Sequence, residues 1–335
     1  MLGNRGLRAD CFPVLQELFF SVTLLLLLFL SADVAKAQAQ EDDERFMRAF
    51  TECFDAAAPQ FFTTSGSMLR YYCGIHSLCE TDADVLLLRI NPADPAGAGR
   101  GPEIATPKAT HFGAYSARIR VPDVKDVQPN IGAVVGYFTY RFTRGFGLSE
   151  IDIEWLLADP TIIYVGTWTS DPQNGRNLQR VGRTVNLATG EILSTNYRSY
   201  RDGNENHDFD SADDASMTPR TIAPIEGYDA SKRFYVYGFD WYPDRITWWM
   251  EHPDTHEKVI IWDYCGTTPE YSGIPQSPSI YRLNYWHTNN WAVETNPDSL
   301  EPPKYPYILE VDWMRYEPYD DLNVAWRRQN GMENL

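Results

Sequence analysis

The sequence lacks the short motifs that announce several common kinds of active site. It has no C-x-x-C pair, no H-E-x-x-H, no G-x-S-x-G elbow and no N-x-S/T acceptor. These absences argue against a zinc site, a serine hydrolase and N-glycosylation. His252 and His256 stand four residues apart, but Pro253 occupies the place of the required glutamate. A hairpin insertion explains this pair better than a metal site.

Long hydrophobic runs are also scarce. One apolar run extends from Leu18 to Leu30, follows Arg5 and Arg8, and precedes the small residues of Ala35-Lys36-Ala37. It is shorter than the ~20 residues that a membrane-spanning helix needs. We therefore expect residues 1–37 to be a cleaved signal peptide, and the protein to be secreted and extracellular, with cell-wall association open.

Positive charge is low: 29 basic residues face 46 acidic ones, for a net charge of −17. Removing residues 1–37 takes away three of each sign and leaves that value unchanged. Such a surface repels phosphate backbones and anionic lipid, which excludes nucleic acid and membrane surfaces as expected partners. The polar C-terminal end carries no lipid-anchor signal, and no stable membrane insertion is expected.

Cysteine is sparse, but its number suggests disulfides. Cys11 belongs to the expected signal peptide, which leaves Cys53, Cys73, Cys79 and Cys265. Four cysteines in a secreted chain suggest two bonds with three possible connectivities. One of them closes a small loop between Cys73 and Cys79 and joins Cys53 to Cys265.

Helical periodicity over a dozen residues is missing throughout, and strand patterns take its place. Residues 38–82 form an N-terminal extension with cysteines and a possible short helix near Glu44–Phe54. Short β-rich runs bounded by Gly, Pro and Asp then recur without intervening helices. They predict an all-β fold over residues 83–320, an antiparallel β-sandwich of jelly-roll, concanavalin A-like type, followed by a polar tail at 321–335.

Two segments between the strands have interpretable patterns. Tyr242-Pro243-Asp244-Arg245 separates two aromatic runs and predicts a hairpin turn, since proline presets a turn dihedral. Residues 202–214 are polar and favour a solvated loop. They resemble a calcium loop only loosely, because His207 stands where an EF-hand needs glycine.

Three carboxylates alternate along one predicted strand. Glu150, Asp152 and Glu154 share one face, while Ile151 and Ile153 share the other with the following tryptophan. Neighbouring like charges normally destabilise a sheet, so either this is an acidic solvent-facing edge or a function compensates the cost. Retaining glycoside hydrolysis is such a function, because it needs a nucleophile and a proton donor roughly 5 to 5.5 Å apart.

The spacing suits glutamate at both ends of the motif. Cα atoms four residues apart on a strand are about 13 Å from each other, so both side chains must be long and lean together. Asp152 between them can hydrogen-bond the nucleophile. The crowded negative charge should raise at least one pKa, as a general acid near neutral pH requires.

Further segments give the sequence a family resemblance. With its E-x-D-x-E strand it resembles glycoside hydrolase family 16, in the branch of lichenases, xyloglucan endotransglycosylases and fungal wall transglycosylases, over roughly residues 84–318. The segments that carry the likeness are HFGAYSARIR at 111–120, YGFDWYPDRITW at 237–248, LNYW at 283–286 and VDWMRY at 311–316.

The resemblance implies a role for each site residue. Glu150 would be the nucleophile, Asp152 its helper and Glu154 the acid/base, on a concave sheet that forms an open cleft. Substrate contacts would come from positions matching the family or from nearby rings: Arg118, Asn284, Trp286, Trp168 and Trp291. For the last two rings, core or rim packing remains an alternative.

Some positions depart from the family pattern. Ser116 and the segment Val165–Trp168 replace residues that contact substrate in lichenases, which leaves the particular glucan open. Asp312 matches a position near a structural calcium in some relatives, although no other ligands can be traced. We expect no required cofactor and no catalytic metal.

The expected function is that of a secreted, monomeric, retaining endo-β-glucanase. Its substrate would be a β-1,3- or mixed β-1,3/1,4-glucan, cleaved by double displacement. The alternatives are a glucan transglycosylase that remodels cell wall and a lectin-like carbohydrate-binding protein without turnover. The intact set of three carboxylates speaks against the lectin.

Overall fold

The computed structural model describes residues 46–54, 59–64, 71–75, 84–173, 175–201, 204–209, 221–266, 273–289, 291 and 299–332. Met47–Ala325 form one compact unit. The expected signal peptide lies outside the described residues.

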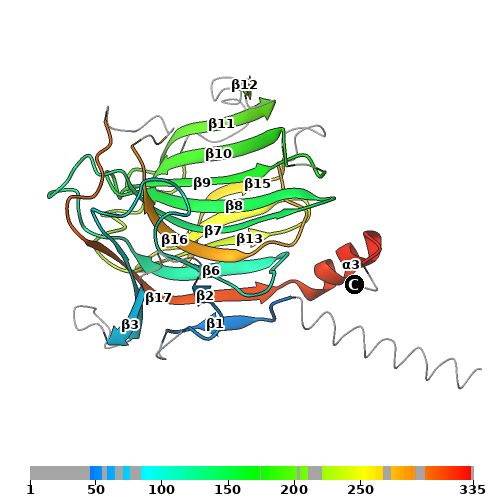
Figure 1. Cartoon of the computed structure of the whole chain (residues 1–335), viewed down its shortest axis with the longest axis horizontal. Helices are drawn as coiled ribbons and strands as arrows, with labels where there is room; N and C mark the ends of the chain where they lie inside the picture. Colours follow the sequence, from blue (N-terminus) through cyan, green and yellow to red (C-terminus); the bar gives the residue numbers. More distant parts are fainter. Residues whose placement is uncertain are drawn as a thin grey trace, which may run out of the picture. The chain divides into compact units, whose positions relative to one another are not determined.

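The described strands form two antiparallel sheets (Figure 1). Sheet 1 runs in the order β15 (Lys258–Tyr264), β14 (Ile246–Glu251), β13 (Tyr235–Trp241), β6 (Gly113–Arg120), β17 (Tyr307–Pro318), β4 (Asp84–Ile90) and β3 (Tyr71–Ile75), and β1 (Phe50–Glu52) also pairs with β17. Sheet 2 runs in the order β12 (Asn204–Phe209), β11 (Glu191–Arg201), β10 (Leu178–Asn186), β9 (Ile162–Thr169), β8 (Gly147–Leu156), β7 (Ala133–Thr143), β16 (Tyr281–His287), β5 (Glu103–Ala105) and β2 (Thr63–Thr64). The predicted all-β, antiparallel jelly-roll sandwich is confirmed.

The burial of β6 shows why these segments become strands. Tyr115, Ala117 and Ile119 are fully buried, while the residues between them are partly exposed. An apolar face with a period of two residues can be covered only if the strand lies flat against a partner layer. Strands β7 to β11 follow one another in the chain and lie side by side in sheet 2 (Figure 1).

Aromatic side chains fill the space between the sheets. Trp248 of β14 donates its indole N–H to the backbone oxygen of Asp152 on β8, at 3.0 Å. Tyr281 of β16 donates to the backbone oxygen of Ser116 on β6, at 3.2 Å. Both bonds run from one sheet to the other. They satisfy polar groups that burial would otherwise leave unpaired, as close packing of large rings requires.

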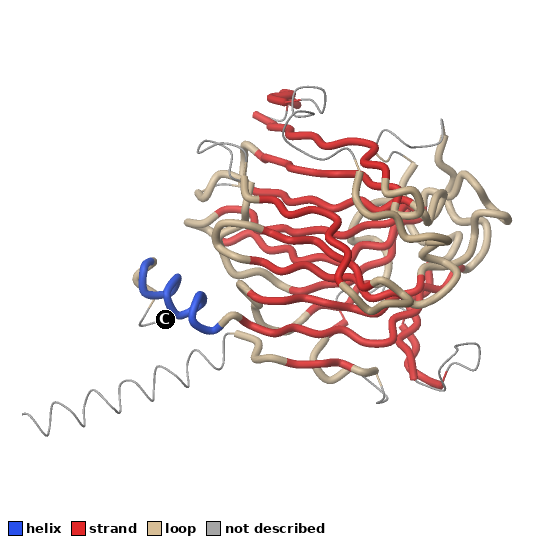
Figure 2. Tube along the Cα trace, turned by 180° about the vertical axis from the view of Figure 1, so that it is seen from behind, coloured by secondary structure: helices blue, strands red, loops and turns tan. Residues whose placement is uncertain are grey.

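The predicted hairpin turn after β13 is confirmed. The Tyr242 N–H donates to the Arg245 carbonyl at 2.9 Å, and β13 pairs antiparallel with β14 on either side of it. The view from behind shows the strands in red across the body of the molecule (Figure 2).

Two local predictions are wrong, and the expected polar tail contains a helix that was not predicted. Phe50–Glu52 is strand β1 rather than part of a helix, because it pairs with β17. Asn204–Phe209 is strand β12 rather than an irregular loop, because it extends sheet 2 beside β11. The polar tail contains helix α3 (Asp320–Gln329), which has acidic residues in its first turn and basic ones in its last, as the helix dipole favours. Among the described helices none is long and apolar enough to cross a membrane.

The suggested bond between Cys53 and Cys265 is absent, since Cys265 is an exposed free thiol. Cys79 lies outside the described residues, so the second suggested bond stays a prediction.

Replacing Ile153 with alanine should lower the free energy of unfolding by about 2–5 kcal/mol, because Ile153 is fully buried and the vacated volume cannot refill. The matched control is Ile260→Ala on β15, whose side chain is 43% exposed and should cost less than about 1 kcal/mol. Urea unfolding of both variants checks this. Equal losses would contradict the assigned facing of β8.

Candidate active site

Strand β8 presents its three carboxylates on the face that points away from the core. Ile151 and Ile153 are fully buried on the opposite face, as is Trp155. Glu150 and Glu154 are half-buried, and Asp152 is buried with 4% exposure. The predicted division between an apolar and an acidic face of this strand is therefore confirmed.

Cross-strand register defines the neighbours of each carboxylate. On β7 and β9, Glu150 lies between Tyr140 and Trp168, Asp152 between Phe138 and Gly166, and Glu154 between Gly136 and Tyr164. Paired residues project to the same face of a sheet. The carboxylates are thus flanked by aromatic rings and by two glycines that leave space above the sheet.

A cavity of about 570 Å³ opens over these carboxylates. It brings together five of the predicted site residues, namely Glu150, Asp152, Glu154, Asn284 and Trp286. The remaining lining residues are Ala98, Gly99, Gly101, Glu103, Phe138, Tyr140 and Arg282. Carboxylates and aromatic rings in one open cavity can bind a polar chain and exchange protons with it.

Trp168 and Trp291 lie beside the cavity rather than in its lining. Trp168 is cross-strand from Glu150, and its ring lies 5.6 Å from the Arg180 guanidinium carbon. The Trp291 ring is 5.8 Å from that of Trp286 and 6.3 Å from that of Tyr164. Both rings remain candidate contacts for a longer ligand.

The assignment of Arg118 to the substrate cleft is wrong. Arg118 is on β6 of sheet 1, whereas the carboxylates are on sheet 2. It alternates with the core residues Ala117 and Ile119 and therefore points away from the sandwich interior. Its guanidinium pairs with Asp312 and lies over the Phe234 ring, at 4.8 Å.

The same ion pair bears on the calcium position. The Asp312 carboxylate is engaged by Arg118. Within the described ranges, no three histidine, cysteine, aspartate or glutamate side chains are arranged so that they could hold a metal ion. Calcium also takes backbone and amide oxygens as ligands, so a structural calcium near Asp312 stays a prediction of the family resemblance, and no step of the chemistry is assigned to a metal.

Two arginines near the carboxylates were missed by the sequence analysis. Arg282 of β16 forms an ion pair with Glu103, and its guanidinium carbon lies 5.9 Å from the Tyr140 ring centre. Arg180 of β10 donates from Nε to the Tyr164 hydroxyl at 2.8 Å. Arg282 could have been found, since it is two residues before Asn284 and so shares its face. Arg180 comes from a more distant strand whose register the sequence does not reveal.

Two side-chain oxygens of the cavity lining are buried. Oδ2 of Asp152 and Oδ1 of Asn284 are buried and have no hydrogen-bond partner among the described residues. Asn284 leans over Gly136, where an added Cβ would lie 2.5 Å from its Oδ1. Buried acceptors are costly unless they are satisfied, and both side chains line the cavity, so a bound hydroxyl can satisfy them.

The environment raises the pKa of all three carboxyls. Burial, followed by repulsion from Glu154, raises the pKa of Glu150 to about 8. Burial raises the pKa of Glu154 to about 7, against the positive charge of Arg180. Burial and both glutamates raise the pKa of Asp152 well above its usual value. The site therefore retains protons near neutral pH, as a general acid must.

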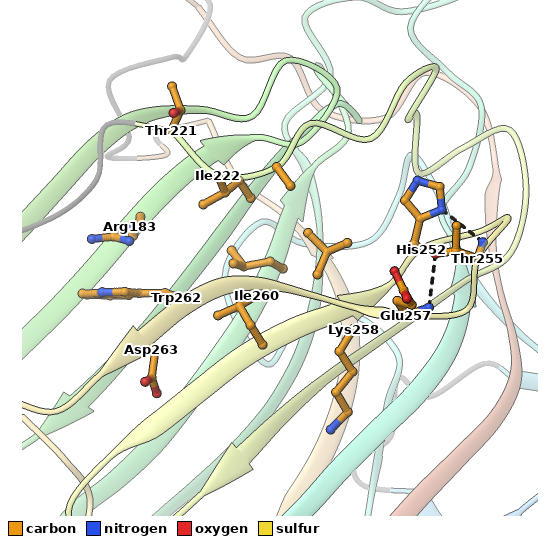
Figure 3. Close-up of a pocket in the computed structure, with 13 residues that line it drawn as sticks. Arg183, Thr221, Ile222, His252, Thr255, Glu257, Lys258, Ile260, Trp262 and Asp263 are labelled. Atoms are coloured by element: carbon orange, nitrogen blue, oxygen red, sulfur yellow. Dashed lines mark hydrogen bonds between the residues drawn. The ribbon is translucent and has the colours of Figure 1, made fainter.

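A second cavity, of about 780 Å³, lies along β15. Arg183 and Trp262 lie at one end of it and His252 and Thr255 at the other (Figure 3). Although it is larger, it contains no close set of carboxylates, and apolar side chains such as Ile260 separate its polar ends. The cavity over β8 is therefore the candidate active site.

Comparisons with known proteins give distant matches to β-glucanases. No protein-family model matches the chain. It is 24% identical to a β-glucanase of Bacillus amyloliquefaciens over 209 residues, which cover 61% of this chain and 59% of that protein. It is 28% identical to a β-glucanase of Paenibacillus polymyxa over 191 residues, which cover 56% and 54% of the two chains. The chain thus spans little more than half of these curated relatives.

Solved structures give distant matches. A lichenase from a mouse hindgut metagenome matches with 20% identity and a TM-score of 0.46, covering 81% of this chain and all of that one. The Crh5 transglycosylase matches with 15% identity and a TM-score of 0.45, covering 82% and 85%. The β-glucanase matches in sequence confirm the resemblance to glycoside hydrolase family 16 that the motifs indicated.

Replacing Glu150 with glutamine should stabilise the protein at alkaline pH. Between its ordinary pKa of 4.5 and the folded value of about 8, the folded state holds a proton that the unfolded state has released. Rising pH therefore favours unfolding of the wild type. The variant should match the wild type near pH 4 and exceed its stability by on the order of 1–3 kcal/mol at pH 9.

Thermal unfolding at pH 4 to 9 measures this difference. Glu257→Gln, on the exposed turn between β14 and β15, is the control and should show no pH-dependent gap. A gap for Glu150→Gln that stays constant with pH would contradict the raised pKa.

Proposed function

We propose that this chain is a secreted, retaining endo-β-glucanase of the glycoside hydrolase family 16 type. The observation that carries the proposal is the row Glu150, Asp152 and Glu154 at one cavity, in an environment that keeps carboxyls protonated near neutral pH. The similarity to bacterial β-glucanases supports β-glucan as the substrate class. Secretion is supported by the signal-like pattern of residues 1–37.

Glu150 and Glu154 titrate as a coupled pair whose raised pKa values belong to both groups. In the first proposed step the proton that the pair keeps near neutral pH is on Glu154, and Glu150 attacks the anomeric carbon as a carboxylate. Glu154 is protonated and gives its proton to the glycosidic oxygen, so the bond between that oxygen and the anomeric carbon breaks. The products are a shortened chain with a free hydroxyl and a glycosyl ester on Glu150. The order of the two roles follows the family resemblance.

In the second step Glu154, now a carboxylate, takes a proton from water. The water oxygen attacks the anomeric carbon, and Glu150 leaves as a carboxylate. Two inversions at the same carbon retain its configuration. Asp152, between the two glutamates in the row, is proposed to hold Glu150 in position. A sugar hydroxyl in place of water would give transglycosylation by the same step.

The buried charge favours an enzyme over a lectin. Three neighbouring carboxyls that are buried enough to raise their pKa values destabilise the fold at neutral pH. A protein that only binds a neutral sugar needs hydrogen-bonding groups, but it does not need buried carboxyls that destabilise its fold. Proton transfer and nucleophilic attack require carboxyls with this spacing and acidity.

Catalytic roles can be separated with two variants. Glu150→Gln and Glu154→Gln should each lower kcat on barley β-glucan or laminarin by at least about 10²-fold, because each removes a reacting group. With an activated dinitrophenyl β-glycoside, whose leaving group needs no proton, Glu154→Gln should still form the glycosyl ester rapidly. Glu150→Gln should not.

Pre-steady-state release of dinitrophenol measures ester formation, and product analysis with oligosaccharide acceptors separates hydrolysis from transfer. Glu257→Gln is the matched surface control. Wild-type rates in both active-site variants would refute the proposed mechanism.

Trp286 should contribute to binding more than to chemistry. It lines the cavity two residues after Asn284, and its half-buried ring can pack on the apolar face of a sugar. Trp286→Ala should raise KM on a soluble β-glucan about 10-fold and change kcat less than about 3-fold. This is the result expected when a lost contact had stabilised the bound substrate and the transition state equally. Steady-state kinetics checks this. A loss confined to kcat would place Trp286 in the chemical step instead.

A further inference from the structure

Tyr164 lies flat over two glycines next to the carboxylates. It is cross-strand from Glu154, yet its hydroxyl reaches over Gly166 and Gly182. A Cβ added at Gly166 or Gly182 would lie 2.6 or 2.4 Å from that hydroxyl oxygen, which is closer than any real contact. Gly166 is itself the cross-strand partner of Asp152. The two glycines thus create the space that lets the phenol lean from the Glu154 row to the Asp152 row.

Arg180 holds this phenol from the next strand. Its Nε donates to the Tyr164 hydroxyl at 2.8 Å, and its guanidinium carbon is 5.0 Å from the Tyr164 ring centre and 5.6 Å from that of Trp168. Arg180 is only 7% exposed. A buried guanidinium that is hydrogen-bonded and stacked on two rings has little freedom to move.

The charges around Glu154 come from several strands. Glu150 and Asp152 accompany it on β8, Tyr164 of β9 is its cross-strand partner, and Arg180 of β10 is hydrogen-bonded to the Tyr164 hydroxyl. On its other side the cavity contains neutral Tyr140 and Asn284, together with the ion pair of Arg282 and Glu103. Arg180 lowers the pKa of both Glu154 and Asp152 against the effect of burial. Burial raises the pKa of Tyr164 to about 12, so its hydroxyl keeps its proton.

We infer that Arg180 and Tyr164 are a pair of positioning residues for the acid/base carboxyl, in which Tyr164 anchors a fixed positive charge beside Glu154 and Asp152. This role rests on the proposed function, in which Glu154 changes from a neutral acid to a carboxylate as it releases its proton. A charge already in place stabilises the developing carboxylate without reorganisation. In the proposed steps the pair acts through Glu154 and forms or breaks no bond itself.

The test compares Arg180→Gln, Arg180→Lys and Tyr164→Phe with the wild type. Arg180→Gln removes the charge and should move the titration of Glu154 upward by about 1 pH unit, since an opposite charge nearby favours the ionised form. Tyr164→Phe keeps the ring but removes the hydroxyl that accepts the hydrogen bond from Arg180. It should raise the pKa of Glu154 by a smaller amount. Arg180→Lys keeps a positive charge without the fixed geometry. The pKa of Glu154 in this variant should stay close to the wild-type value, whereas kcat should fall.

Matched controls come from a second arginine–tyrosine pair. Arg245 stacks on Tyr242 at 4.8 Å in the hairpin turn of sheet 1, so Arg245→Gln and Tyr242→Phe repeat the same changes away from the cavity. Neither control should alter the titration of Glu154 or the pH profile. Circular dichroism and thermal unfolding confirm that each compared variant is folded.

Two readouts keep this inference separate from the proposed function. Carbon-13 NMR of glutamate-labelled full-length protein, with Glu154→Gln to assign the signal, follows Glu154 without any substrate. The alkaline limb of kcat/KM on laminarin or barley β-glucan follows it during turnover. Absence of turnover in the wild type would refute the proposed function alone. A Glu154 titration that is the same in wild type and Arg180→Gln would overturn the positioning role, even in an active enzyme.

Discussion

The alternation of side chains along β8 is the constraint on which the site depends. Ile151, Ile153 and Trp155 are fully buried between the sheets, so the three carboxylates must point to the other face of the strand. Trp248 ties the backbone of Asp152 to the opposite sheet from below. A shift of β8 by one residue would expose the apolar side chains and bury the acids in the core, so burial and chemistry select the same register.

Three glycines near the carboxylates shape the site by leaving room for neighbouring side chains. Gly136 leaves room for Asn284, and Gly166 with Gly182 leaves room for Tyr164. Each glycine sits next to the acidic row or one strand further away. Because these glycines have no side chains, Asn284 and Tyr164 can lie across the neighbouring strands. The result is a polar surface around the carboxylates on rigid strands rather than on loops.

Electrostatics is balanced locally although the chain as a whole carries a charge of −17. Arg282 counters Glu150 from β16, and Arg180 counters Glu154 from β10. Burial nevertheless outweighs both arginines, and the glutamates keep raised pKa values. The two glutamates can therefore hold a proton near neutral pH, because the charge of neither arginine brings their pKa values back to the ordinary range.

The sequence alone determined the sandwich, the strand β8 and the facing of Glu150, Asp152 and Glu154, because a period of two residues is a local property of a chain. It placed Asn284 and Trp286 through motif resemblance, and the cavity brings them together with the carboxylates. Arg118 was misplaced because a motif does not say which sheet its strand joins.

Tertiary structure alone decided the contacts between strands that are far apart in the sequence. Arg180 meets Tyr164 and Arg282 meets Glu103 only through the order and register of the sheet. Those depend on the sum of all cross-strand and intersheet packing, which no local pattern encodes.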